Sequence, residues 1–311
     1  MVYRKIQLPF KIKKPVLALG SQTKNTVCFA KGDFAYLSQV HPDLSNPLEF
    51  SKFEKEVKHF LKLYPEIIAY DLHPDYQSTK YAQGLNFKPD RLRLVQHHHA
   101  HIASCMAENS MKNQKVIGVS FDGTGMGGDY KIWGAEFLIC DYKNYERKAH
   151  LKEVPLLGGE RAILEPWRLA AAWLYLAYKD RFLNLGIGFV KGLDKKKWKI
   201  LKELDAKDIN SPLASSMGRL FDAVASLVLA KYKANFEAEL AIELEKMGKA
   251  YTKNAGSYKF KIEKNNHSYL VSPVSIFKEI VQDLKANETR QKIAYRFHLT
   301  VAEIIRSACL K

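Results

Sequence analysis

The sequence predicts an α/β protein of two lobes, in which mixed sheets are flanked by helices. Short apolar runs alternate with segments of helical periodicity through the first third of the chain, as they do in α/β domains. A strand–loop–strand–strand pattern occurs twice, about 100 residues apart, which indicates a duplicated architecture. The length of 311 residues, with 47% hydrophobic and 26% charged residues, leaves room for two cores.

The first copy of the pattern opens with a buried strand at residues 16–19, which runs into a small, polar loop at 20–26. Two further strands follow between residues 27 and 37, on either side of a tight turn at 31–33. A polar loop after the first strand can offer backbone N–H groups to a phosphate, and Lys24 adds a cation there. A plain hairpin turn is the alternative interpretation.

The next segments continue the alternation. The periodicity predicts, in order, a helix at 50–63, a strand at 67–71, a helix at 78–83 and a strand at 92–95. The last of these strands leads directly into a cluster of histidines.

Four of the ten histidines lie within five residues, at His97, His98, His99 and His101. In a helix, His97 and His101 are four residues apart and share a face, which is a spacing that brings two imidazoles to one metal ion. His98 and His101, three residues apart, are the competing pair. A polar helix start with locally hydrogen-bonded histidines is the alternative to a metal site.

The second copy of the pattern begins with a strand at 116–121 and a glycine-rich loop at 122–129. Strands at 133–140 and 145–151 complete it. Two α/β lobes that each open in this way describe the actin-like ATPase (ASKHA) fold, in which a nucleotide lies between the lobes. We therefore expect an N-terminal lobe at 1–114 that carries the histidine motif.

The expected second lobe, 115–311, holds the glycine-rich hairpin loop and a helical insert, and it ends C-terminally incomplete. Asp122 ends its strand at the mouth of the loop, where carboxylates commonly face a metal or a nucleotide. The loop glycines allow a ligand to approach the backbone closely. No Gly-Lys-Ser/Thr follows, so the loop is not a Walker loop.

From Pro166 onward the sequence is mainly helical. It predicts helices at 167–179, 183–208 (in part), 218 onward, 236–245, 272–284 and 289–310, a loop at 211–217 and a hairpin at 258–269. Gly218 and Asp222 lie one turn apart at a helix start, where glycine admits a ligand and a carboxylate accepts from ribose hydroxyls. Ordinary helix N-terminal chemistry is the alternative.

The bulk properties limit the partners and the compartment. The net charge is +16, but no basic stripe is interleaved with aromatic residues, so a solvated lysine-rich surface is expected and nucleic-acid binding is not. The four cysteines are scattered without a Cys-x-x-Cys pair, which favours a reducing cytoplasm. We find neither a signal peptide nor an apolar run that would span a membrane.

Several motifs together resemble one family. They are KNTVCFAKGDFAYLSQ (24–39), DLHPDYQSTKYA (71–82), VQHHHAHIASCMAE (95–108), FDGTGMGGDYKIWGAEFL (121–138), EPWRLAAAWL (165–174) and SSMGRLFDAVASL (215–227). The chain from Val16 onward resembles the C-terminal module of the carbamoyltransferase HypF of NiFe hydrogenase maturation, which is related to threonylcarbamoyl transferases of the TsaD type.

The resemblance implies a metal, iron or zinc, on His97, His101 and Asp122. It also implies that ATP, AMP or carbamoyl-adenylate is bound by a set of residues from both lobes: Lys24, Gly123, Thr124, Gly125, Gly218, Asp222 and Glu237. The implied reaction transfers a carbamoyl group from carbamoyl-adenylate to the C-terminal cysteine thiolate of HypE. No built-in nucleophile is expected.

The chain departs from the family pattern in ways that leave alternatives open. The acylphosphatase, zinc-finger and YrdC-like modules are absent, so a separate YrdC-like module would have to make the adenylate. The phosphate loop has Gly20-Ser21 where two glycines are usual, and the Glu-Gly-Gln stretch reads Glu237-Ala238-Glu239. The segment with a fourth metal ligand is also missing. A catalytically incomplete scaffold that binds HypE or nucleotide is therefore the alternative, and a transferase acting on tRNA is a third reading.

Overall fold

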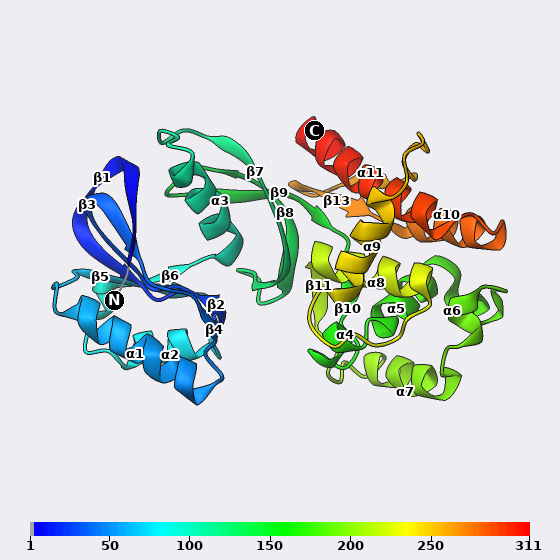
Figure 1. Cartoon of the computed structure of the whole chain (residues 1–311), viewed down its shortest axis with the longest axis horizontal. Helices are drawn as coiled ribbons and strands as arrows, with labels where there is room; N and C mark the ends of the chain where they lie inside the picture. The colour runs from blue at the N-terminus through cyan, green and yellow to red at the C-terminus, as the bar shows by residue number, and fades with distance from the viewer. Residues whose placement is uncertain (1–2) are drawn as a thin grey trace. The chain divides into compact units, whose positions relative to one another are not determined.

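The computed structural model describes residues 3–311, which fold into two compact units (Figure 1). The first unit holds the chain up to residue 116 together with 125–130 and 140–145, and the second unit holds 117–124, 131–139 and 146–311. Sheets in the structure contain both parallel and antiparallel strand pairs, and helices flank them. The predicted mixed α/β class is confirmed.

The first unit is built on a four-stranded sheet. Its strands, in spatial order, are β3 (Cys28–Leu37), β1 (Arg4–Ala18), β5 (Ile67–Asp71) and β6 (Leu92–Val95). β1 pairs antiparallel with β3 and parallel with β5, which pairs parallel with β6. The remaining elements are the strand pair β2 (Thr23–Asn25) and β4 (His41–Asp43), the helices α1 (Pro47–Leu61), α2 (Gln77–Gly84) and α3 (His97–Glu108), and the turn η1 (Pro89–Arg91).

Helix α1 forms for local reasons and closes the core of this unit. The Asn46 side chain accepts from Leu48 N at 2.9 Å, and Pro47 occupies the first turn, where its missing N–H costs nothing. One face of the helix is buried in a cluster with the sheet, and the cluster contains Phe53, Val57, Phe60, Leu17, Phe29 and Ile68.

One expectation for the first unit was wrong. The predicted tight turn at 31–33 lies inside a continuous strand, β3, because β1 begins at Arg4 and pairs with β3 along its length. Gly32, at φ +60°, sits opposite Ile12 at a register shift, so the glycine makes a bulge there and does not reverse the chain. Apolar residues at every second position before Pro15 were the overlooked strand signal.

The second sheet has seven strands. Its order is β10 (Val154–Pro155), β11 (Leu213–Ser216), β8 (Ile132–Cys140), β9 (Tyr145–Leu151), β13 (Ser268–Ser272) and β12 (Lys261–Asn265), with β7 (Val116–Met126) paired to β8. The helices are α4 (Arg161–Leu164), α5 (Trp167–Tyr178), α6 (Gly188–Lys191), α7 (Lys195–Asp205), α8 (Met217–Leu229), α9 (Glu239–Lys249), α10 (Val274–Lys285) and α11 (Arg290–Cys309), with the turn η2 (Lys179–Asn184) after α5.

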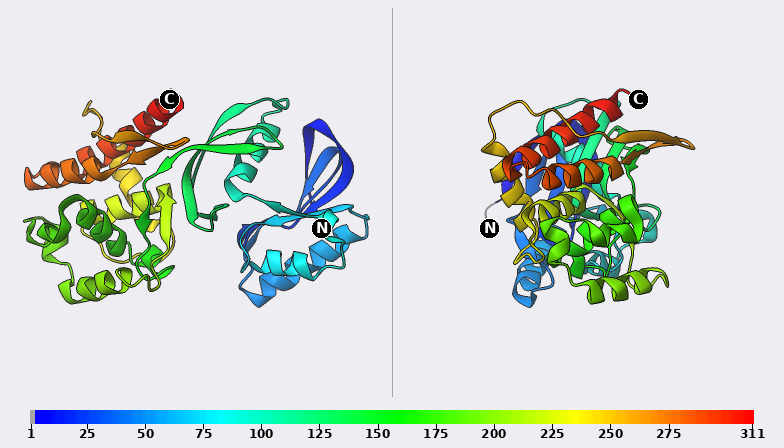
Figure 2. Two further views of the ribbon diagram at one scale, coloured as in Figure 1. Left: turned by 180° about the vertical axis from the view of Figure 1, so that it is seen from behind. Right: turned by 90° about the vertical axis from the view of Figure 1, so that its right-hand side faces the viewer.

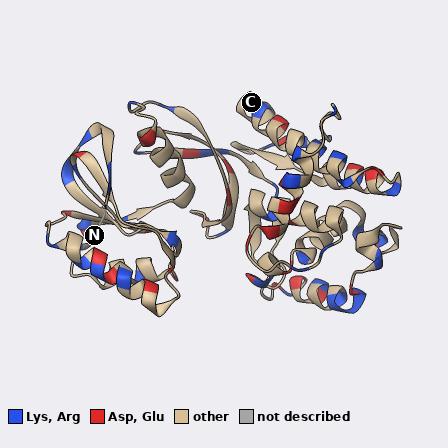
Figure 3. Cartoon of the chain, in the orientation of Figure 1, with Lys and Arg blue, Asp and Glu red and all other residues tan. Residues whose placement is uncertain are grey.

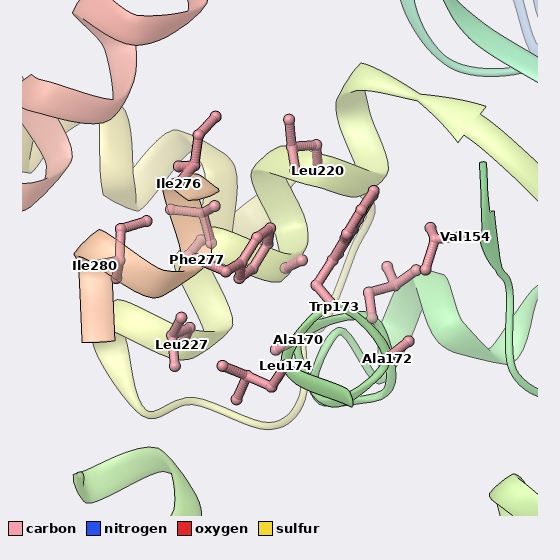
Figure 4. Close-up of a cluster of buried hydrophobic side chains, with 14 of the residues drawn as sticks. Val154, Ala170, Ala172, Trp173, Leu174, Leu220, Leu227, Ile276, Phe277 and Ile280 are labelled. Atoms are coloured by element: carbon pink, nitrogen blue, oxygen red, sulfur yellow. The ribbon is translucent and has the colours of Figure 1, made fainter. Parts of the chain in front are cut away.

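Helices α5, α8 and α10 meet in the core of the second unit. Trp173 is fully buried, and its ring stacks on Phe277 with centroids 5.5 Å apart (Figure 4). Figure 2 shows α10, α11 and the β12–β13 hairpin side by side in both views. This packing holds α8, which carries the Gly-Arg-Leu-Phe-Asp segment, as a rigid element.

Two expectations for the second lobe were also wrong. Asp122 to Gly125 do not form a glycine-rich loop, because β7 continues through them to Met126 while pairing with β8. The predicted loop at 211–217 contains β11, which pairs in parallel with β8 through Ala214 and Ile132. Both segments have little intrinsic strand signal, so long-range pairing decided their conformation.

Charged side chains of both signs are interleaved along α1 and α7 (Figure 3). On α7 the buried residues are Trp198 and Leu201, and most of its lysines face solvent. This arrangement is typical of a solvated helix face. Among residues 3–311, no helix combines the length and the apolar character needed to cross a bilayer.

Candidate functional site

The start of α3 is fixed by a glutamine that caps it. Gln96 is buried, and its Oε1 accepts from His99 N at 2.8 Å. Its Nε2 lies 3.2 Å from the carbonyl of Met126 on β7 and 3.0 Å from His98 Nδ1. One amide therefore joins the first turn of α3 to the end of β7.

The helix gives the four histidines different surroundings. His97 and His101 share a face, with their Nε2 atoms 3.1 Å apart. His98 is fully buried, and His99 donates from Nε2 to the carbonyl of Asp141 at 2.7 Å. Within α3 the ring nitrogens of the pair four residues apart therefore converge.

Strand β7 runs closely against this turn. A Cβ added at Gly125 would lie 2.6 Å from His98 Cε1 and 2.9 Å from His97 Cδ2, so only glycine fits there. Asp122 is three residues earlier on the same strand. His97 and His101 belong to the first unit and Asp122 belongs to the second, so their joint role as metal ligands stays a prediction.

The donor chemistry suits a divalent cation such as zinc or iron. Two imidazole nitrogens and a carboxylate oxygen are ligands that both metals accept. Tetrahedral coordination with metal–nitrogen bonds of about 2.0–2.1 Å separates neighbouring ligand atoms by about 3.3 Å. The 3.1 Å between the two Nε2 atoms is close to that separation.

In the second unit, the strand segment at Asp122 and Gly123 passes very close to the start of α8. A Cβ on Gly218 would lie 2.9 Å from Gly123 Cα, and one on Gly134 would lie 2.7 Å from the carbonyl oxygen of Asp122. Ser216 caps α8 by accepting from Arg219 N at 3.1 Å, and its hydroxyl lies 2.9 Å and 2.6 Å from the carbonyl oxygens of Asp122 and Gly123. Glycine is required here for close backbone approach.

A buried ion pair follows on the first turn of α8. Arg219 Nε lies 3.0 Å from Asp222 Oδ2, and Arg219 Nη2 lies 3.3 Å from Glu237 Oε1. Arg219 and Asp222 are 2% and 3% exposed. Their ion pair is close in distance but does not have the geometry of a hydrogen bond, so that Arg219 Nε, Arg219 Nη1 and Asp222 Oδ2 are left without a hydrogen-bond partner. Burial raises the pKa of Asp222 to about 6, against the lowering effect of Arg219.

The ion pair between Arg219 and Glu237 lies beside a glycine. An added Cβ at Gly123 would lie 2.7 Å from Glu237 Oε1 and 3.4 Å from Arg219 Nη2. Buried polar atoms without partners are rare, and a bound ligand can supply the missing contacts. Arg219 was not predicted from the sequence, although an arginine between Gly218 and Asp222 in a helix start was the available signal.

Lys24 belongs to the first unit, on the exposed edge of β2, at φ +48°. The loop before it is closed by the buried Asn25, whose Nδ2 donates to the carbonyls of Leu19 and Ser21 at 2.7 and 2.5 Å. Gly123, Thr124, Gly218, Asp222 and Glu237 all belong to the second unit. The joint role of Lys24 and these residues therefore stays a prediction.

Two family models match the chain. One, described as a HypF Kae1-like domain, matches residues 11–108. The other, described as the second subdomain of the Kae1-like domain of carbamoyltransferases, matches residues 118–311. Together they cover both halves of the sequence.

Curated relatives carry the same description. The chain is 38% identical over 258 residues to the carbamoyltransferase HypF of Synechocystis sp., which covers 77% of this chain and 33% of the relative. It is 36% identical over 244 residues to a carbamoyltransferase HypF homolog of Cupriavidus necator, which covers 76% of this chain and 60% of that protein. The chain thus spans about a third to three fifths of the length of these relatives.

Solved structures agree in fold. A crystal structure of full-length HypF in a phosphate- and nucleotide-bound form superposes with a TM-score of 0.90 at 37% identity, over 99% of this chain and 47% of that one. The crystal structure of HypF from T. kodakarensis superposes with a TM-score of 0.82 at 32% identity, over 96% of this chain and 39% of that one.

Proposed function

Because this chain belongs to the HypF family of Kae1-like carbamoyltransferase domains, we propose that it transfers a carbamoyl group from carbamoyl-adenylate to the C-terminal cysteine thiolate of HypE. The relatives are named carbamoyltransferases, and one similar structure is described as nucleotide-bound. These names support a transferase that handles a nucleotide.

The buried Arg219–Asp222 pair beside Gly123 is the observation that carries the nucleotide part. Asp222 Oδ2 lacks a hydrogen-bond donor, and a ribose hydroxyl would supply one. The Glu237 side chain, half exposed at its ion pair with Arg219, can accept from a second hydroxyl. The backbone at Gly123 and Thr124 would face the phosphate, and Lys24 and Gly125 complete the proposed nucleotide site.

His97, His101 and Asp122 would hold the metal. A divalent cation bound there would act as a Lewis acid toward the carbamoyl oxygen or the phosphate. The protein's own contribution is to hold the two imidazoles on one rigid helix face, so that little freedom is lost when they bind. The strand that carries Asp122 also carries Gly123, so one element serves both parts of the site.

The proposed transfer is a substitution at the carbamoyl carbon. The HypE thiolate attacks that carbon, a carbon–sulfur bond forms, and the carbon–oxygen bond to AMP breaks. AMP leaves with the electron pair of that bond as its phosphate, so no external oxidant or base is consumed. The acceptor must be a reduced thiol, and we therefore propose the cytoplasm as the compartment.

A YrdC-like module would make the carbamoyl-adenylate. The test is to incubate the chain with carbamoyl-adenylate and HypE and to measure the mass of HypE. We expect HypE to gain one carbamoyl group, and we expect His101→Ala to abolish the gain. His267→Ala, which changes a histidine in the β12–β13 turn, is the matched control and should retain it.

The alternative function, a scaffold that binds HypE or nucleotide without turnover, gives a different result in the same assay. HypE would then bind to the chain without any mass change, and His101→Ala would leave that binding unaltered. Product formation in the presence of the wild-type chain, and its loss in the variant, would refute the scaffold.

A further inference from the structure

The Asp71-Leu72-His73-Pro74-Asp75-Tyr76 segment has no place in the function described so far. It begins at the end of β5 with Asp71, whose side chain is buried. Both carboxylate oxygens have partners. Oδ1 accepts from His73 N at 2.9 Å, and Oδ2 lies 2.9 Å from Nδ1 of His97, 26 residues further along the chain.

The contact with His97 determines which ring nitrogen carries the proton. An ionised carboxylate can only accept hydrogen bonds, so Nδ1 of His97 must be the donor. In the neutral imidazole, the lone pair is then on Nε2. That is the nitrogen that lies 3.1 Å from Nε2 of His101.

The sheet holds Asp71 in place for this contact. β5 pairs in parallel with β6, and Asp71 is in register with Val95, two residues before His97. The Thr79 hydroxyl donates to the backbone carbonyl of Asp71 at 3.1 Å, which ties the end of β5 to α2. The backbone of Asp71 is therefore fixed by β6 and by Thr79 of α2, and its carboxylate is held by the N–H of His73.

We propose that Asp71 is the positioning residue of the metal site: it fixes the tautomer and the ring orientation of His97 so that Nε2 is presented to the cation. The inference rests on the proposed function, since it requires His97 to be a ligand. Carboxylates that accept from the second nitrogen of a ligand histidine typically change metal affinity by 10–100-fold when they are removed.

The decisive variant is Asp71→Asn. The asparagine Oδ1 can still accept from His73 N, but its amide nitrogen then faces Nδ1 of His97. Because the amide donates, Nδ1 must accept, and the proton moves to Nε2, where it blocks the metal. We expect the affinity of the metal-free chain for Zn²⁺, measured by competition with a chelator, to fall about 10–100-fold.

Asp75→Asn is the matched control. It makes the same change of charge in the same segment, but Asp75 is exposed and its carboxylate lies 3.3 Å from Lys80 Nζ. The affinity of this variant for Zn²⁺ should stay within about twofold of wild type, because surface ion pairs contribute little. Asp71→Ala, which leaves no side-chain acceptor for Nδ1, should lose affinity like Asp71→Asn and serves if the asparagine variant does not fold.

A second readout does not depend on the metal or on activity. Nitrogen-15 NMR of the metal-free chain should find the proton of His97 on Nδ1 in wild type and on Nε2 in Asp71→Asn. Equal Zn²⁺ affinity of Asp71→Asn and Asp75→Asn, with wild type binding tightly, would overturn the role of Asp71 and leave the metal site standing. Absence of Zn²⁺ and Fe²⁺ binding by wild type would overturn the metal site itself and the inference with it.

Discussion

Ser216→Ala removes a hydroxyl that connects the cap of α8 to β7. The Oγ atom accepts from Arg219 N, and it lies within 2.9 Å of the carbonyl oxygens of Asp122 and Gly123. Loss of an N-cap costs about 1 kcal/mol. The hydroxyl has one proton, so one further hydrogen bond to a carbonyl is lost, at about 1 kcal/mol. We expect a loss of about 2 kcal/mol in the free energy of unfolding.

Urea denaturation measures this loss. If the free energy of unfolding of the variant falls with urea concentration at the same slope as in wild type, the folded and unfolded states of the two proteins expose the same difference in surface. Thr289→Ala is the matched control, because Thr289 caps α11 by accepting from Lys292 N at 3.3 Å and lies on the surface. It should cost about 1 kcal/mol at most. Ser216→Ala should also weaken AMP binding, whereas Thr289→Ala should not. An equal loss of unfolding free energy in Ser216→Ala and Thr289→Ala, together with unchanged AMP affinity, would refute the idea that Ser216 connects α8 to β7.

Three further predictions concern single residues. Gly125→Ala should lower Zn²⁺ affinity, measured by chelator competition, because the new Cβ would lie 2.6 Å from His98 Cε1 and such overpacking costs about 1–3 kcal/mol. The affinity for AMP, measured by calorimetry, should rise as the pH increases through about 6. Burial raises the pKa of Asp222 to about 6, and ribose hydroxyls donate to the ionised carboxylate. The Asp222→Asn variant should lose this pH dependence. Tyr258→Phe should lower the free energy of unfolding by about 1.5–3 kcal/mol in urea titrations, because the buried hydroxyl donates to Asp283 Oδ2 at 2.7 Å.

Local patterns were sufficient for the elements with strong periodicity. The strands at 67–71, 92–95 and 145–151 were predicted with the bounds that the structure has, and α5 was predicted to within one residue. The apolar runs of α5 and of the strand at 67–71 were the signals for these elements, whereas the strand at 145–151 was predicted from the repeated strand order. The spacing of His97 and His101 was sufficient in the same way, since residues four apart in a helix are neighbours on one face, one turn apart.

The predictions that were wrong concern segments whose conformation depends on pairing with distant strands. Asp122 to Gly125 read as a glycine loop, but pairing with β8 makes them a strand, and that strand lies against the turn of α3 through Gly125. Gly32 read as a turn, but pairing with β1 makes it a bulge. Backbone hydrogen bonds between distant strands outweigh local preference there, and no short window of sequence contains them.

The sequence by itself determined the α/β class, the histidine pair and the residue types that suit a metal and a nucleotide. Only the tertiary structure decided how those residues are supported. It placed Asp71 against Nδ1 of His97 across 26 residues of sequence, and it buried Arg219 beside Asp222 with atoms left unsatisfied. Hydrogen bonds across a sheet and burial in a core are properties of the folded chain, because they depend on which distant segments are brought together.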